Sequence, residues 1–339
     1  MLNPFIHWVE ARGPVAPWLF LALFLASSFL MLWRLEALSA AGFEGTVLGT
    51  LVMPYCSGMG NLIFAFILGR SATGNGADVM TNSLVNNVTN MTLVLGLPAL
   101  IWGMNVVPKA KPDAAKKKAK SGGRPHELNR LSLLLTLLAV LFFTGVVWAM
   151  GRKGSLDSSD GLVLVGMFLF WQFFHVFEVL KQSERQGKSA VGWMFPVDIA
   201  LLAVGAYGIY VSTDWLVGWV STSYSGFISV KHLGWLSGWL MVLPNAVMAF
   251  YYGFKKQPEI VYASQVGDAH VSIPLCLGVY CLYHRMPLPP FFQMSMFILV
   301  TAALVHFFFV GLFGRLPRAV GAILVGAYAV FLWKGLMGF

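Results

Sequence analysis

Long uncharged apolar runs recur along the chain, and they constrain its fold more than any other feature. They cover about residues 17–38, 43–69, 80–103, 129–150, 161–182, 193–213, 233–254, 260–284, 291–313 and 317–337. A helix of roughly 20 apolar residues crosses a bilayer core of about 30 Å, whereas a membrane β-barrel shows shorter segments of alternating hydrophobicity. The sequence therefore predicts an all-α polytopic membrane protein with about ten transmembrane helices. The Trp-rich segment 214–232 is assigned to no span, and an extra interfacial helix is one interpretation of it.

The composition excludes several classes of protein. Of the 339 residues, 58% are hydrophobic and 11% are charged, whereas a soluble domain has about 25% charged residues. Cys56, Cys276 and Cys281 lie in apolar runs and have neither disulfide nor metal-site spacing. The sequence contains no metalloprotease His/Glu motif, no Gly-x-Ser-x-Gly nucleophile motif and no phosphate-binding glycine loop. We therefore expect neither an enzyme nor a resident cofactor.

The distribution of positive charge predicts the orientation in the membrane. With the N-terminus outside, sixteen of the 23 Lys and Arg residues fall on the cytoplasmic side, and the basic loop 104–128 supplies about half of them. Such an excess is typical of cytoplasmic loops. The net charge of +9 therefore gives no reason to expect nucleic acid. We expect an integral protein of the plasma (inner) membrane with lipid as partner, and an oligomeric state that the sequence does not specify.

The segment LVNNVTNMTLVLG, residues 84–96, places three asparagines inside an apolar run. Asn82, Asn86 and Asn90 recur at intervals of four, which places them on one face of a helix, and Asn87 belongs to an adjoining stripe. A polar group without a partner in hydrocarbon costs on the order of several kcal/mol. These amides are therefore expected to face a cavity, an ion or one another.

A second window of the sequence repeats this arrangement. The first window, GNLIFAFILGRSATGNGADVMTNSLVNNVTNMTLVLGLPAL, begins at Gly60, and the second, PNAVMAFYYGFKKQPEIVYASQVGDAHVSIPLCLGVYCL, begins at Pro244. Each runs from an Asn through an apolar stretch, a Gly-plus-basic turn and a polar helix to Leu-x-Leu-Gly. Equivalent spans of the two copies are five spans apart, an odd number, so the second copy is inverted in the membrane. Inverted repeats are typical of secondary transporters, whose site lies where the repeats meet.

The polar helix of the second window carries an acidic residue at its centre. Ser264, Asp268 and Ser272 are four residues apart, with Gln265 beside them. Carboxylate, amide and hydroxyl oxygens are hard ligands that can replace the water around a cation. For any one polar residue the alternative is helix–helix adhesion, worth about 0.6–2 kcal/mol per contact. The repetition in two inverted copies favours an ion pathway.

These motifs resemble the paired repeats of the cation/Ca2+ exchanger superfamily, which includes the sodium/calcium exchangers. SGMGNL and VLPNAV are similar to the family's Gly-Thr-Ser-x-Pro-Glu motif, and TNSLVNNVTNMTLVLG and ASQVGDAHVSIPLCLG are similar to its Gly-Asn-x-x-Gly-Ser-Asn helix. The resemblance implies two inverted five-helix repeats: residues 1–182, with core motif 57–96, and residues 183–339, with core motif 243–278. It also implies a secondary cation antiporter that works by alternating access.

Both positions of the family's signature glutamate carry amides here, Asn61 and Asn245. Asp268 is then the only charged ligand, and it is expected to set the competition with protons or Na+. A Ca2+ held by one carboxylate keeps an uncompensated positive charge, and a charge at the bilayer centre costs at least about 2.5–3.5 kcal/mol. A monovalent ion would be balanced. Na+, Ca2+ and H+ all remain candidate substrates at this point.

The predicted ion ligands come from both repeats: Asn61, Asn86, Asn87, Asn90, Asn245, Ser264 and Asp268, with Asp268 as the metal ligand. Gly60, Pro244 and Gly267 are expected to permit helix breaks that expose backbone carbonyls. His270, two residues after Asp268, is either a proton relay or a helix-packing residue.

Three alternatives remain open from the sequence. A monovalent cation/proton antiporter on the same scaffold fits the single carboxylate. A transporter of a neutral or anionic solute fits the Asn pairs. A membrane sensor or assembly subunit that no longer transports fits the missing glutamates. The substitution Asp268→Asn separates these classes, because only transport of a cation through Asp268 requires its charge.

Overall fold

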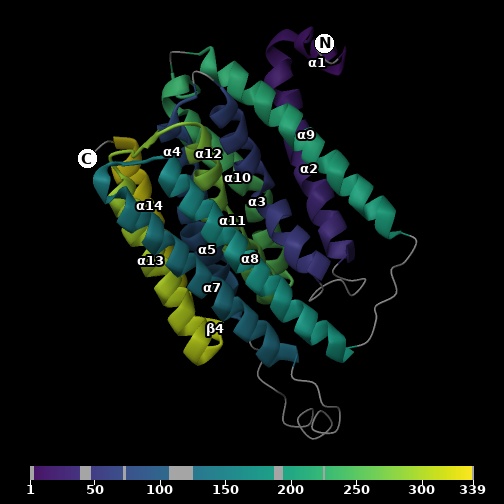
Figure 1. Cartoon of the computed structure of the whole chain (residues 1–339), viewed down its shortest axis with the longest axis vertical. Coiled ribbons are helices and arrows are strands. Elements are labelled where there is room, and N and C mark those ends of the chain that lie inside the picture. Colours follow the sequence, from purple (N-terminus) through teal and green to yellow (C-terminus); the bar gives the residue numbers. More distant parts are fainter. Residues whose placement is uncertain are drawn as a thin grey trace, which may run out of the picture.

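The computed structural model describes residues 4–38, 47–71, 74–106, 125–186, 194–223 and 226–337, which form a bundle of long helices (Figure 1). Most of these helices are strongly apolar along their length, as spanning segments in lipid must be. The helices of the first half are α1 Pro4–Glu10, α2 Ala16–Leu38, α3 Val47–Arg70, α4 Gly76–Val88, α5 Leu95–Trp102, α7 Pro125–Met150 and α8 Ser158–Gln186. Between them lie the 3-10 turns η1 Gly13–Val15 and η4 Gly151–Lys153 and the π-helical segment η3 Thr89–Val94.

The second half has the same kinds of element. Its helices are α9 Phe195–Ser221, α10 Leu233–Phe254, α11 Pro258–Val271, α12 Leu277–Tyr283, α13 Phe292–Phe308 and α14 Arg318–Met337. They are joined by the 3-10 turn η5 Val230–His232 and by the π-helical segments η6 Ser272–Cys276 and η7 Phe309–Phe313. In each half a π-helical segment directly precedes the Leu-Gly at the start of α5 or α12, so the polar helix continues into its neighbour without a loop.

The membrane spans agree with those predicted from the sequence. Within the described residues, 8 helices are long and apolar enough to cross a membrane, and Gly58–Arg70 and Ser158–Phe174 are shorter apolar helices. The segment 214–232 corrects the sequence interpretation, because residues 214–221 continue α9 and the described residues between α9 and η5 form no separate helix. The helix was underestimated because Asp214 interrupts its apolar run. Most of the predicted loop 104–128 lies outside the described residues.

Two short strand pairs join the halves of the chain in a symmetrical way. Strand β1 (Met104–Asn105) follows α5 and pairs antiparallel with β4 (Arg315–Leu316), which precedes α14. Strand β3 (Met286–Pro287) follows α12 and pairs antiparallel with β2 (Ser155–Leu156), which precedes α8. If the two halves of the chain are exchanged, β1 takes the place of β3 and β4 takes the place of β2, so one pair becomes the other. This is the pattern that a two-fold relation between inverted repeats produces.

Close backbone contacts between helices obey the same two-fold relation. A Cβ atom on Gly96 of α5 would lie 3.0 Å from the carbonyl oxygen of Gly321 on α14, and one on Gly278 of α12 would lie 3.2 Å from that of Gly161 on α8. In the opposite direction, a Cβ atom on Gly321 would lie 2.7 Å from the Gly96 carbonyl oxygen. One on Gly161 would lie 2.9 Å from the Gly278 carbonyl oxygen. Small residues permit such close crossings of membrane helices.

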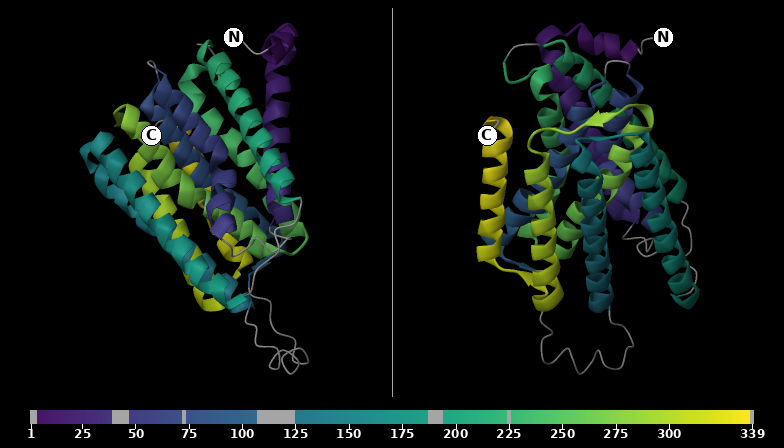
Figure 2. Two further views of the ribbon diagram at one scale, coloured as in Figure 1. Left: turned by 45° about the vertical axis from the view of Figure 1, so that its right-hand side comes forward. Right: turned by 60° about the vertical axis from the view of Figure 1, so that its left-hand side comes forward.

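Helices α2 and α9 lie side by side along one flank of the bundle (Figures 1 and 2). Gly205 of α9 approaches Met31 of α2 so closely that a Cβ atom would lie 2.4 Å from the Met31 Cγ. A buried ion pair joins the same two helices, with 3.1 Å between Arg34 Nη1 and Asp198 Oδ1. The flank therefore holds one helix from each half.

Candidate ion site

Four helices bring polar side chains to the centre of the bundle. Helices α3 and α4 come from the first half and α10 and α11 from the second, and they pack against one another. They carry Asn61, Asn86, Asn245 and Asp268 respectively, and Asn90 follows α4 in η3. All five side chains are buried, and Asp268 has no exposed surface. A fully buried carboxylate needs hydrogen-bond donors or a cation around it.

Amide groups surround the Asp268 carboxylate. The Nδ2 atoms of Asn86 and Asn90 each donate to Asp268 Oδ2 at 2.7 Å. Asn245 Nδ2 donates to the same oxygen at 3.3 Å, and Asn61 Nδ2 reaches Oδ1 at 3.5 Å. The first half thus supplies three amides, while the second half supplies one amide and the charge. Hydrogen bonds to a charged group contribute about 1.5–3 kcal/mol each. Asn86 and Asn90 make the shortest of these bonds and therefore hold the carboxylate most firmly.

Glycine lets the backbone of α3 approach the carboxylate. A Cβ atom on Gly58 would lie 3.3 Å from Asp268 Oδ1. One on Gly60, further along α3, would lie 2.3 Å from the sulfur of Met241 on α10. Gly58 lies in the motif SGMGNL, but a glycine within an apolar helix gives no sign in the sequence of which neighbour approaches it.

The centre also contains oxygen atoms without partners. Among the described residues, the Oδ1 atoms of Asn61, Asn86 and Asn90 are buried and accept no hydrogen bond. The same is true of Ser264 Oγ and Gln265 Oε1 on α11. Rotation of an amide by half a turn exchanges its nitrogen and its oxygen. The Asn side chains can therefore present either N–H groups to the carboxylate or oxygen ligands to a cation beside it.

Asn87 and His270, although predicted as site residues, face other neighbours than the carboxylate. Asn87 Nδ2 donates to the Ser83 carbonyl at 2.7 Å, and Asn87 Oδ1 accepts from Ser272 Oγ at 2.9 Å. Asn87 thus links the two polar helices to each other. The ring of His270 is 5% exposed and lies among aromatic rings, with centroids of Phe143, Phe168 and Trp171 at 5.9, 5.8 and 6.0 Å.

The helix irregularities lie elsewhere than predicted. Helices α3, α10 and α11 continue through Gly60, Pro244 and Gly267 respectively. Gly60 serves close packing against α10, and Pro244 leaves one helix carbonyl without its usual donor. No atom beyond its own helix lies within 4 Å of a Cβ built on Gly267. The two polar helices depart from α-helix at the π-helical segments η3, which contains Asn90, and η6, which begins at Ser272, four residues after Asp268.

A buried histidine on α13, His306, holds the first π-helical segment. His306 Nε2 lies 2.8 Å from the Met91 carbonyl in η3, and Nδ1 lies 3.0 Å from the Tyr262 hydroxyl on α11. A carbonyl only accepts, so Nε2 donates to Met91 and Nδ1 accepts from Tyr262. Met91 is the neighbour of Asn90. His306 on α13 therefore links the segment that carries Asn90 to the helix that carries Asp268.

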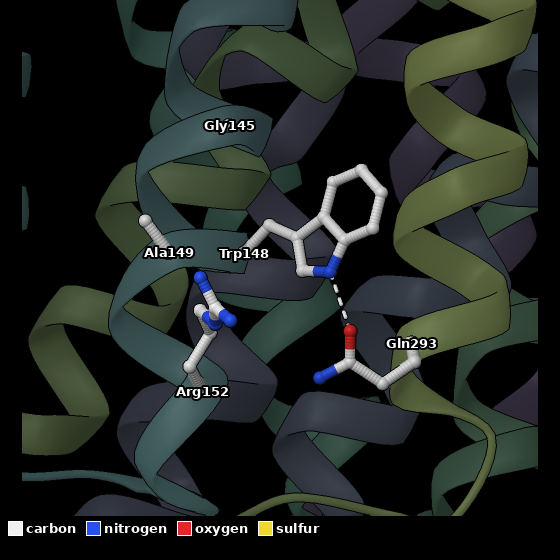
Figure 3. A pocket seen from close by; sticks show the side chains of 5 residues that line it. All are labelled: Gly145, Trp148, Ala149, Arg152 and Gln293. Atoms are coloured by element: carbon white, nitrogen blue, oxygen red, sulfur yellow. Dashed lines mark hydrogen bonds between the residues drawn. The ribbon is translucent and has the colours of Figure 1, made fainter.

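Other features do not compete with this centre as an ion site. The described residues contain no group of three or more His, Cys, Asp or Glu that could hold a metal ion. A pocket of about 610 Å³ between α7 and α13 is lined by Gly145, Trp148, Ala149, Arg152 and Gln293, none of them a ligand of Asp268 (Figure 3). Asp268 with its amides is therefore the candidate site.

Comparisons with known proteins agree with this architecture. The model of the family described as "Sodium/calcium exchanger protein" matches residues 15–177 and 197–335. The sodium-calcium exchanger NCX_Mj soaked with 2.5 mM Na+ and 1 mM Sr2+ has a TM-score of 0.63 and 18% identity, over 93% of this chain and 96% of that one. The same exchanger soaked with zero Na+ and Ca2+ has a TM-score of 0.62 and 18% identity, over 94% and 98% of the two chains.

At this level of identity the likeness to NCX_Mj shows a common fold. No curated protein matches the sequence. The family model, in contrast, covers both halves of the chain and most of its length. This protein belongs to the sodium/calcium exchanger family.

Proposed function

We propose that this protein is a secondary active cation antiporter that works by alternating access, with Asp268 as the charged ligand of its ion site. One observation carries the proposal: amides from both halves of the chain converge on a single, fully buried carboxylate. Family membership makes it a transporter and not an enzyme. A site between two inverted repeats is exposed to either side of the membrane when one repeat rocks against the other.

The charge of the site favours monovalent cations. Among the described residues, Asp268 is the only acidic one in the group that meets at the centre. One Na+ or one H+ would neutralise it, whereas one Ca2+ would leave a net positive charge, which costs at least about 2.5–3.5 kcal/mol near the bilayer centre. The proposed exchange is therefore one Na+ against one H+, and it moves no net charge.

The two substrates use the same residues differently. For Na+, the carboxylate and the rotated amides of Asn61, Asn86 and Asn90 supply oxygen ligands. For H+, Asp268 becomes a neutral acid whose O–H donates to one of these amide oxygens. Competition for one carboxylate then couples the two ions, because only one of them neutralises it at a time.

Ca2+ is the second candidate substrate, and the unpartnered oxygens favour it. Buried oxygens that have no partner in the described part of the chain belong to Asn61, Asn86, Asn90, Ser264 and Gln265. Such hard neutral ligands suit Ca2+, but its affinity depends on the number of charged ligands. With one carboxylate the site would bind Ca2+ more weakly than a site with several.

The proposal includes an orientation. The N-terminus and the connection between α7 and α8 lie outside, and the loop 104–128 lies in the cytoplasm, because this arrangement places most Lys and Arg inside. The two repeats, residues 1–182 and 183–339, then have opposite orientations. Residues 57–96 and 243–278 are their equivalent core motifs.

Transport in proteoliposomes tests the function. A Na+ gradient imposed on purified protein should drive an opposite flow of protons, reported by an internal pH dye, and clamping the membrane potential should not change the rate. Asp268→Asn should abolish the flow. Asp214→Asn, which removes an exposed carboxylate on α9, is the matched control and should leave it intact.

The same vesicles distinguish the candidates. Uptake of 45Ca2+ that follows the Na+ gradient and disappears in Asp268→Asn would replace the monovalent assignment by Ca2+ exchange. Folded, inserted protein that moves neither protons, Na+ nor Ca2+ would refute the antiporter proposal. It would favour a neutral-solute transporter or a membrane sensor on the same fold.

A further inference from the structure

The pocket between α7 and α13 shares no lining residue with the candidate ion site and lies at the end of a membrane span. The fourth span covers Leu133–Lys153, and the pocket is lined by Trp148, Ala149 and Arg152 near the end of that span. Trp and Arg near the end of a span lie at the level of the lipid headgroups. Three of the residues that line the pocket, Gly145, Ala149 and Arg152, are exposed, so the pocket opens at the surface of the bundle.

The polar groups that remain available to a ligand in the pocket are hydrogen-bond donors. Gln293 Oε1 accepts a hydrogen bond from Trp148 Nε1, which leaves the amide nitrogen of Gln293 on the side of the opening that faces Arg152 (Figure 3). Arg152 is exposed, and among the described residues it has neither an ion pair nor a hydrogen bond. Its neighbour Lys153 is occupied by Asp157 at 2.6 Å and Asp160 at 2.7 Å.

An apolar track leads from this opening along α7 into the membrane. Leu138, Phe142, Gly145 and Ala149 are all exposed, and with Arg152 they recur every three or four residues, which places them on one face. A Cβ atom on Gly145 would have no neighbour within 4 Å. The space beside Gly145 is therefore open to an acyl chain, and Gly145 also lines the pocket.

We propose that this pocket binds one membrane phospholipid, with its phosphodiester held by the guanidinium of Arg152 and the amide nitrogen of Gln293 and one acyl chain along the exposed face of α7. Guanidinium and amide N–H groups are complementary to a phosphate oxygen and not to a cation. The unpaired charge of Arg152 matches the single negative charge of a phosphodiester.

Such a lipid would connect the two repeats. Helix α7 belongs to the first half and α13 to the second, and they already meet through the Trp148–Gln293 hydrogen bond. A Cβ atom on Gly151 would lie 2.5 Å from the ring of Phe292, so the ends of the helices are in close contact beside the pocket. Helix α13 also carries His306, which holds the segment next to Asn90.

Native mass spectrometry of the purified full chain tests the site without any transport measurement. Phosphatidylglycerol should remain bound at collision energies that remove diacylglycerol, which has the same tails but no phosphate. Arg152→Gln should reduce the lipid-bound fraction about tenfold, as the loss of a charge-assisted hydrogen bond predicts. Gln293→Leu should reduce it as well, and Arg152→Lys should retain part of it. Lys231→Gln, which removes an exposed cation after α9, is the matched control and should bind like the wild type.

Three results would overturn the proposal. Diacylglycerol retained as well as phosphatidylglycerol would show that only the apolar face binds. Equal loss of lipid in Arg152→Gln and Lys231→Gln would show that no specific site exists. Competition by soluble glycerol phosphate would show a site for free phosphate in place of a lipid. Thermal unfolding of each variant without added lipid identifies any that fail to fold. If Arg152→Gln fails to fold, lipid binding by Gln293→Leu decides the outcome.

Discussion

At the scale of single residues, asparagine is the side chain that makes one buried carboxylate tolerable. Each amide offers a donor on one side and an acceptor on the other, so Asn86 and Asn90 satisfy Asp268 directly, at 2.7 Å, and can turn oxygen toward a cation. A glutamate at the position of Asn61 or Asn245 would add a second negative charge to the same space. The amides therefore set the charge of the site at one.

The charge argument predicts the effect of adding a carboxylate. Asn245→Asp places a second carboxylate where Asn245 Nδ2 lies 3.3 Å from Asp268 Oδ2. Two carboxylates at this distance repel each other, and a divalent cation relieves the repulsion. We expect 45Ca2+ binding to strengthen by about tenfold or more, since charged ligands set Ca2+ affinity.

Scintillation proximity on purified protein measures this binding. The control is Asn82→Asp, because Asn82 donates to Ser237 Oγ at 3.0 Å and not to Asp268. Equal Ca2+ affinity in the wild type and Asn245→Asp would contradict the assignment of Asn245 to the ion site.

His306 gives a second prediction at this scale. His306→Phe removes the donor to the Met91 carbonyl and the acceptor of the Tyr262 hydroxyl, all of them buried. Each buried polar group left unpaired costs about 1–3 kcal/mol. We expect the thermal unfolding midpoint in detergent to fall by several degrees. His284→Phe, at an exposed position, should leave it nearly unchanged, and an equal midpoint for both variants would rule out the bridging role of His306.

Spacing along one helix could predict part of the site, and contacts between helices could not. The interval of four correctly placed Asn86 and Asn90 on one face, and the structure brings both to Asp268. Asn87 follows Asn86 in sequence but is turned by about 100°, and it bonds Ser272 instead. The bridge through His306 joins three separate helices, and no local pattern in the sequence marks such a contact.

At the scale of elements, the two polar helices share one device. Each contains a π-helical segment, which includes Asn90 in the first half and begins four residues after Asp268 in the second, and then resumes as an α-helix at Leu-Gly. A π-helical segment shifts the register of the following residues and frees backbone groups, and it is frequent at functional sites. The sequence predicted an irregularity but placed it at glycine and proline. The actual position depends on tertiary partners such as His306, which satisfies the Met91 carbonyl.

The glycine crossings predict a stability effect specific to one face of α8. Gly161→Val would place a Cβ atom 2.9 Å from the Gly278 carbonyl and 2.8 Å from Cys281 Cβ, so α8 must move away from α12. Overpacking of this kind costs about 1–3 kcal/mol. Gly166→Val on the same helix is the control, because nothing lies within 4 Å of its Cβ. The thermal midpoint should fall for Gly161→Val only, and a fall in both would indicate a general effect of valine on α8.

At the scale of the whole molecule, one part of the two-fold arrangement could be predicted from the sequence and another part could not. The ten spans and the inverted pair of core motifs could be predicted because apolar runs and repeated motifs are local patterns. The pairing of β1 with β4 and of β2 with β3 could not, because each strand has only two residues and its partner lies in the other half. These pairs nevertheless reveal the two-fold relation most directly.

The proposed orientation predicts which ends of α10 face each side of the membrane. Lys231 precedes α10 and Lys255 follows it, both are exposed, and the helix between them is a membrane span. The Lys and Arg bias places Lys231 outside and Lys255 in the cytoplasm. In a background without the three native cysteines, Lys231→Cys should react with an impermeant maleimide added to intact cells. Lys255→Cys should react only after the cells are opened. The opposite pattern would invert the orientation of both repeats while leaving the ion site unchanged, and reaction of both from outside would show that α10 does not span the membrane.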